Sequence, residues 1–164
     1  MGYVGSYLWN LRRRVGGDVV LLPGASVLVE DADGRVLLVR RGDDGSWCMP
    51  GGGAERDSSF LSTAVAELRE ETGLSVEPDD LVAFASVSEP GVHRLTYPNG
   101  DVTHCFALWF HADRWTGDAR ADGEESVEVG FFGRDELPSP LMAPARLALD
   151  LFDRYRATGR FQAR

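Results

Sequence analysis

Three glutamates, Glu67, Glu70 and Glu71, have the spacing that most clearly points to chemistry. They belong to a segment with helical periodicity over about residues 59–72, in which positions i, i+3 and i+4 share one face. Three carboxylates on one face repel one another, and the helix macrodipole disfavours negative charge near the C-terminal end. A solvated acidic face is the ordinary explanation for such a pattern. A divalent cation, which prefers oxygen ligands, would instead relieve the repulsion.

The residues around these glutamates favour the metal interpretation. Leu61, Val65 and Leu68 fall on a separate arc of the same helix, so that arc is expected to face the core. A run of three glycines, residues 51–53, precedes the helix and would let the backbone approach an ion or a phosphate closely. The sequence therefore predicts a site for Mg²⁺, with Mn²⁺ as a substitute, that activates water and neutralises a phosphate leaving group.

Residues 51–74 resemble the Nudix box, in which a glycine is followed after five residues by Glu and, seven residues later, by Arg-Glu-aliphatic-x-Glu-Glu-x-Gly-aliphatic. Counting from Gly52, the chain supplies in register Glu67, Leu68, Glu70, Glu71, Gly73 and Leu74. The resemblance extends over most of residues 20–140, through the segments 36–41, 47–52 and 124–132 and the pair Leu137-Pro138. A match of this length and order is specific to the family.

The resemblance implies a fold and an activity. The expected fold is a single α/β domain over residues 1–164, a Nudix-type α/β/α sandwich around a mixed β-sheet, with residues 1–18 as a short N-terminal helical extension. The implied enzyme is a Mg²⁺-dependent pyrophosphohydrolase. It would cleave a diphosphate bond in a nucleoside triphosphate, or in a nucleoside diphosphate linked to another group, so the expected partner is a small-molecule nucleotide.

The resemblance also assigns roles to individual residues. Glu67, Glu70 and Glu71 would ligate the metal, and Gly52 would add a backbone carbonyl. One glutamate, with Glu67 and Glu70 as the candidates, would act as general base toward water. Glu125, in the late acidic loop of the family, would assist the metal or the water.

Three further residues are candidates for contact with the substrate. Arg40 and Arg41 end a strand that leads toward the glycine run, so one of them could meet substrate phosphates. Solvated charges at a strand end are the alternative, because adjacent side chains of a strand point to opposite faces. Trp47 could stack on a base, although a tryptophan beside a glycine turn more often packs in the core.

The chain departs from the box at two positions, with Ser58 in place of Glu and Ala66 in place of Arg. In the family these side chains help to fix the loop against the helix by charge pairing. Losing one partner would strand a charge, at about 3–5 kcal/mol if buried, whereas losing both strands none. Loss of such support can still cost about 10–100-fold in metal affinity or activity. The alternative function is therefore a Nudix-fold nucleotide-binding or regulatory module with little or no turnover.

Hydrophobic patterns predict the elements that position the site. Residues 24–40 are expected to form a hairpin, with apolar runs at 25–29 and 36–39 around a turn at 31–34. The remaining elements expected from the patterns are strands at 81–87, 102–110 and 127–132 and a helix at 144–155. The strand at 102–110 is apolar on both faces, which predicts a central position in the sheet.

The N-terminal residues predict one more helix. Tyr3, Tyr7, Leu11 and Val15 recur at i, i+4 spacing and would share one face. Such a helix could pack on its own domain or across a homodimer, and the pattern does not distinguish the two. Arg12 and its two arginine neighbours are expected to form a solvated face.

The composition excludes several classes of protein. A length of 164 residues fits one domain, and 26 acidic against 17 basic residues give a net charge of -9. Such a charge argues against a nucleic-acid polymer or an anionic membrane as partner. Two cysteines, Cys48 and Cys105, are too few for a disulfide scaffold, and no stretch is long and apolar enough for a membrane helix. A cytoplasmic protein is therefore expected.

Overall fold

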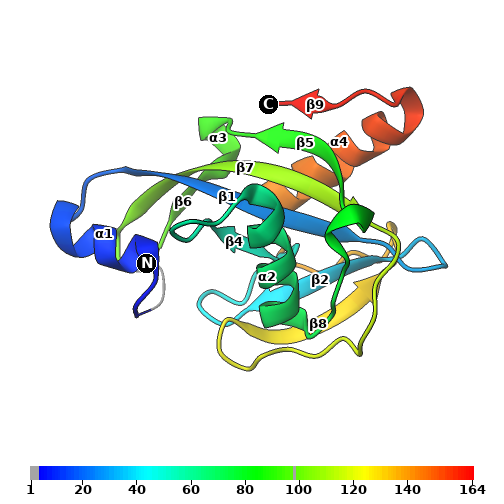
Figure 1. The fold of residues 1–164 in the computed structure, drawn as a ribbon, viewed down its shortest axis with the longest axis horizontal. Coiled ribbons are helices and arrows are strands. Elements are labelled where there is room, and N and C mark those ends of the chain that lie inside the picture. The colour runs from blue at the N-terminus through cyan, green and yellow to red at the C-terminus, as the bar shows by residue number, and fades with distance from the viewer. Residues whose placement is uncertain (1–3, 98) are drawn as a thin grey trace.

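The computed structural model describes residues 4–97 and 99–164 (Figure 1). The helices in these residues are α1 (Tyr7–Val15), α2 (Phe60–Thr72), the 3₁₀ turn η1 (Pro78–Asp80), α3 (Pro90–His93) and α4 (Ala143–Thr158). The strands are β1 (Val20–Val29), β2 (Val36–Arg41), β3 (Trp47–Cys48), β4 (Gly51–Gly53), β5 (Val82–Val87), β6 (Arg94–Thr96), β7 (Val102–Ala112), β8 (Ser126–Phe132) and β9 (Gln162–Ala163).

The strands form two sheets. The larger sheet has the order β4-β1-β7-β5-β9, and β6 also pairs with β7. It is mixed, because β1 runs parallel to β7 but antiparallel to β4. The smaller sheet has the order β3-β2-β8. The expected central strand is confirmed, since β7 lies between β1 and β5.

Helices cover the sheets on both faces, as the alternation of side chains shows. On β1, Leu28 joins a buried cluster with residues of α4, whereas Val27 and Val29 join a second cluster with residues of α2. Figure 1 shows the same layers, with α2 in front of the sheet and α4 behind it. The α/β/α sandwich around a mixed sheet is therefore confirmed.

The predicted hairpin at residues 24–40 is confirmed only at its tip, where Glu30 and Val36 form a single antiparallel bridge. The Asp31 carboxylate accepts hydrogen bonds from the N–H groups of Asp33 and Arg35 and closes a tight turn. Beyond this turn β1 pairs with β4 and β7, and β2 pairs with β3 and β8, so the two strands enter different sheets. Both strands are buried on both faces, and such a pattern does not specify which neighbour a strand pairs with.

Helix α2 has the predicted position because local signals fix both of its ends. The Ser59 hydroxyl accepts the N–H of Ser62, and the Ser62 hydroxyl accepts the N–H of Ser59, which is a capping box. Gly73 ends the helix in the left-handed conformation with a φ of 72°. These caps determine where Glu67 and Glu71 lie, one helical turn apart, on the side of α2 that approaches β4.

The N-terminal helix α1 packs on its own domain with a face shifted from the predicted one, because Tyr7 and Leu11 of the predicted face are only partly buried against it. Its buried residues are Leu8 and Arg12, whereas Val15 is exposed. Leu8 packs with Val20 and with Leu22 of β1. Tyr3, which was part of the predicted face, lies outside the described residues. The expectation of a solvated Arg12 is also wrong, because its side chain reaches back into the domain.

Within the described residues, none of the helices combines the length and the apolar character needed to cross a membrane.

Candidate active site

A cavity of about 280 Å³ lies at the edge of the larger sheet, where β4 is the last strand. The predicted site residues that line it are Arg41, Gly52, Glu67, Glu71 and Glu125. Other lining residues, which sequence reasoning had not placed here, include Ser6, Leu8, Leu22 and Tyr97, and Glu55 lines the cavity as well. The cavity therefore brings together residues from α1, α2, β1, β2, β4 and the loops that connect them.

Glu71 is held by the glycine strand. Its side chain is 8% exposed, and its Oε2 accepts the N–H of Gly51 at 2.8 Å. Burial, followed by the charge of Glu67, raises the pKa of Glu71 to about 8. A Cβ on Gly51 would lie 2.5 Å from the carbonyl oxygen of Ala25, so the strand approaches this closely only because it carries no side chain.

Glu67 lies against the next glycine. A Cβ placed on Gly52 would be 2.3 Å from Glu67 Oε1. Burial raises the pKa of Glu67 to about 7, with smaller contributions from the charges of Glu70 and Glu55. The carbonyl oxygen of Gly52 lies toward β1, 2.5 Å from where Gly24 would carry a Cβ.

This contact predicts a separation of activity from stability. Gly52→Ala should displace the flexible end of Glu67 at little cost in stability, and we expect kcat to fall about tenfold, as for loss of a residue that orients a ligand. Gly24→Ala meets backbone instead and should lower the melting temperature far more. Melting curves and kcat of the two variants, measured side by side, check this. A Gly52→Ala variant that retains wild-type kcat would show that the position of Glu67 is unimportant.

Glu125 comes to the cavity on a loop that is tied to α2. The Asp122 carboxylate accepts the N–H groups of Glu124, Glu125 and Ser126, at 2.7, 2.9 and 3.0 Å. The Ser126 hydroxyl donates to the backbone carbonyl of Glu71 at 2.6 Å. Burial raises the pKa of Glu125 to about 7. The loop and the helix thus position their carboxylates relative to each other.

Glu70 occupies a different place from its two neighbours. Its side chain is exposed and is not among the residues that line the cavity. Its negative charge nevertheless acts on the cavity, because it is the second cause, after burial, of the raised pKa of Glu67. The predicted roles of Glu70 as metal ligand and base therefore stay predictions.

The three candidates for substrate contact separate clearly. Arg41 lines the cavity and forms an ion pair with Asp43. The hydrogen bond to Asp43 and the negative charge of Asp43 raise the pKa of the Arg41 guanidinium. Arg40 points to the other face of β2, where it pairs with Glu128 at 3.6 Å. Trp47 is 6% exposed and packs edge-to-face on Phe132, so its expected stacking on substrate is wrong and it is a core residue.

The two substituted box positions leave no stranded charge. Ser58 donates its hydroxyl hydrogen to the carbonyl of Glu55 at 2.7 Å and accepts the Thr63 hydroxyl at 3.1 Å, so it still braces the loop before α2. Ala66 is exposed on α2. Neither position therefore leaves a buried charge without a partner.

The donor set fits a hard divalent cation in its chemistry. Glu67, Glu71 and Glu125 offer oxygen atoms to one cavity, and burial raises the pKa of all three, so a cation there would favour their charged forms. Among residues 4–97 and 99–164, no three His, Cys, Asp or Glu side chains form a ready-made metal site. Binding would therefore require the carboxylates to converge through changes of rotamer.

The fold and this site define a class of protein, and a comparison of families agrees. The family model described as NUDIX domain matches residues 20–152. The chain therefore belongs to the Nudix family, and the predicted resemblance to this family is confirmed.

Relatives place the chain within that family. It is 38% identical to a MutT-like protein of Streptomyces ambofaciens over 48% of this chain and 52% of the relative. It is 28% identical to an ADP-ribose pyrophosphatase of Methanocaldococcus jannaschii over 66% of this chain and 60% of the relative. The crystal structure of a MutT Nudix hydrolase from Burkholderia pseudomallei superposes with a TM-score of 0.67 at 26% identity, covering 80% of this chain and 97% of that one. The matches thus span about half of the length of the curated relatives.

Proposed function

We propose that this chain is a divalent-metal-dependent hydrolase of a phosphoric anhydride bond in a small nucleotide. Its substrate is a nucleoside triphosphate or a nucleoside diphosphate linked to another group. The observation that carries the proposal is that Glu67, Glu71 and Glu125 line one cavity beside a strand made only of glycine. Membership of the Nudix family supports the same reaction class.

The side chains in the cavity have different roles in the proposed hydrolysis. Glu67 and Glu71 would hold Mg²⁺ or Mn²⁺, which when bound supplies positive charge to the diphosphate and to a reacting water. Glu125 can take a proton from that water at its carboxylate, because a pKa of about 7 suits a general base at neutral pH. Arg41 donates from its guanidinium to a phosphate oxygen, the geometry that this group favours.

The cellular compartment that we propose for this protein is the cytoplasm. The thiols of Cys48 and Cys105 are both free in the structure, which favours a reducing compartment.

A substrate panel tests the proposal. Purified protein is incubated with nucleoside triphosphates, ADP-ribose, nucleotide sugars and dinucleoside polyphosphates, with Mg²⁺, with Mn²⁺ and with chelator, and released nucleoside monophosphate is quantified. We expect release from at least one nucleotide, dependent on metal. Tight binding of a nucleotide without release in either metal would instead support a regulatory module, the function that Ser58 and Ala66 favour.

A further inference from the structure

Part of the cavity is built by residues that precede the family domain. The family model begins at residue 20, whereas Ser6 and Leu8 of α1 line the cavity together with Leu22 and Tyr97. We call these four residues the α1 wall. The carboxylates described above come from other elements, so the cavity has two chemically different sides.

Apart from Ser6, the α1 wall is apolar and aromatic. Leu8 is 6% exposed and belongs to a small cluster with Val20 and Leu22, against which Tyr97 packs. The other side offers Glu67 and Glu71, which would bind a cation and, through it, the phosphates. A nucleotide has the same division, because its base is flat and largely apolar whereas its phosphates are charged.

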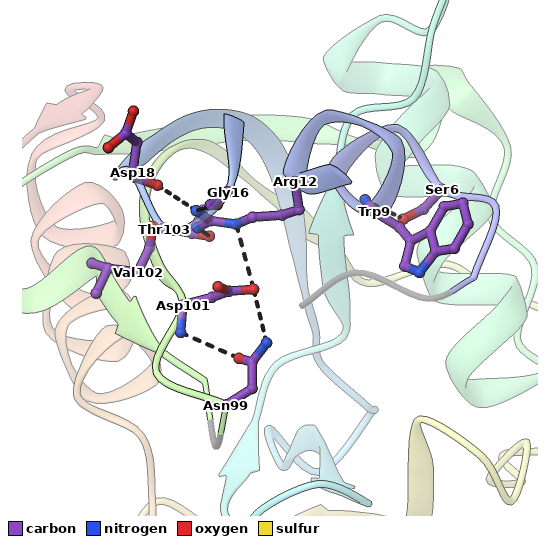
Figure 2. A network of polar contacts seen from close by, with 9 residues as sticks. All are labelled: Ser6, Trp9, Arg12, Gly16, Asp18, Asn99, Asp101, Val102 and Thr103. Carbon is purple, nitrogen blue, oxygen red and sulfur yellow. Dashed lines mark hydrogen bonds and ion pairs between the residues drawn. The ribbon is translucent and has the colours of Figure 1, made fainter. Parts of the chain in front are cut away.

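Arg12 fastens α1 to the rest of the domain, as Figure 2 shows. The side chain is 5% exposed. Its Nη2 donates to Thr103 Oγ1 at 3.0 Å and to the carbonyl of Val102, and its Nη1 donates to the carbonyl of Asp18. Its Nε lies 3.7 Å from the Asp101 carboxylate. One guanidinium therefore joins α1 to the beginning of β7.

The same guanidinium stabilises the turn that carries Tyr97. The Tyr97 N–H donates to the carbonyl of Asp101 at 2.9 Å. Figure 2 shows the Asn99 side-chain amide, which donates to the Asp101 carboxylate at 2.9 Å. At the other end of α1, the Tyr7 N–H donates to the Glu55 carboxylate at 2.8 Å. Both parts of the α1 wall are thus held through Arg12, while the contact to Glu55 sets how far α1 lies from β4.

We propose that the α1 wall binds the nucleoside part of the substrate and that Arg12 is the positioning residue that holds it in place. This rests on the proposed function, because it assumes a nucleotide whose phosphates face the carboxylates. Specificity for the nucleoside then resides partly in a helix outside the family domain.

Equilibrium binding separates the two halves of the ligand. The probes are the non-hydrolysable α,β-methylene diphosphates of adenosine, guanosine, cytidine and uridine, compared by calorimetry in Mg²⁺ with methylenediphosphonate, which lacks a nucleoside. We expect Arg12→Met to weaken the best nucleoside probe about tenfold, the size of effect that lost contacts in a binding pocket produce, and to leave methylenediphosphonate within about twofold. With a substrate, KM should rise and kcat should change little, and Arg12→Lys should recover part of the loss.

The matched control is Arg14→Met, the same exchange on the exposed side of α1, which should change neither probe. Leu8→Ala shortens the α1 wall without touching Arg12, and it decides the matter if Arg12→Met does not fold. If Arg12→Met and Leu8→Ala weaken both kinds of probe equally, or weaken neither, this inference is overturned. Turnover by the wild type would in that case still uphold the proposed function. A wild type that neither binds the nucleoside probes nor releases monophosphate would overturn both.

Discussion

Glu71→Gln should abolish most of the turnover while leaving the fold intact. The amide oxygen of Gln can still accept the Gly51 N–H, so the contact that holds the side chain to β4 survives. The negative charge that a cation needs is lost. Because loss of a residue that merely orients a ligand costs about 10–100-fold, we expect loss of a ligand itself to lower kcat about 100-fold or more.

The control for this prediction is Glu128→Gln. Glu128 is exposed and pairs with Arg40 outside the cavity, so the same chemical change there should leave kcat within about twofold. Steady-state kinetics on the best substrate of the panel, with circular dichroism to verify folding, provide the measurement. Wild-type kcat in Glu71→Gln would remove this residue from the reaction.

The metal-free protein should lose stability as the pH rises through neutrality. Burial raises the pKa of Glu71 from an ordinary value of 4.5 to about 8, and that of Glu67 to about 7. A carboxyl with a raised pKa in the folded state contributes stability below its unfolded pKa, and that stability disappears as the pH rises through the folded pKa. For Glu71 alone, the free energy of unfolding should fall by about 2 kcal/mol between about pH 6.5 and pH 8.5.

This window isolates the carboxylates from the buried histidines. Burial lowers the pKa of His93 and of His111, so their titration affects stability at lower pH. Denaturant unfolding in chelator at several pH values measures the slope, and Glu71→Gln should flatten it. Mg²⁺ should raise the melting temperature more at the high end of the window, because protons compete with metal for the same oxygens. Constant stability of the chelated wild type across the window would contradict the burial of these groups.

The sequence predicted the active-site helix well because its signals are local. Helical periodicity, the Ser59 cap and Gly73 all lie within the segment they define, and so the positions of Glu67 and Glu71 followed. The prediction could not follow strand pairing, since β1 and β2 are apolar on both faces, and β7 and β8, with which they pair most extensively, lie far along the chain. The assignment of the strands was right, but the hairpin drawn from their proximity extends no further than one bridge beside its turn.

Side chains near the site show the same limit. Alternation along β2 separates Arg40 from Arg41 but does not say which face meets the cavity, since that depends on where β8 and β4 lie. The sequence did not indicate the role of Arg12, for a similar reason. Three consecutive arginines indicate a solvated face, and only the approach of β7 turns one of them into a buried anchor. Tertiary contacts decided each of these cases.

The all-glycine strand β4 has a consequence for how this protein can change its specificity. Each of its three glycines has a close neighbour where a side chain would begin. A Cβ on Gly51 would lie 2.3 Å from Ser26 Oγ, a Cβ on Gly52 would lie 2.3 Å from Glu67, and a Cβ on Gly53 would lie 2.9 Å from Leu22. A single substitution in β4 therefore does not enlarge the cavity, and at Gly52 it reshapes the cavity only by displacing Glu67, at a cost in turnover. Adaptation to a new nucleotide has to proceed through the surrounding segments, which an engineer can randomise while leaving the reaction centre untouched.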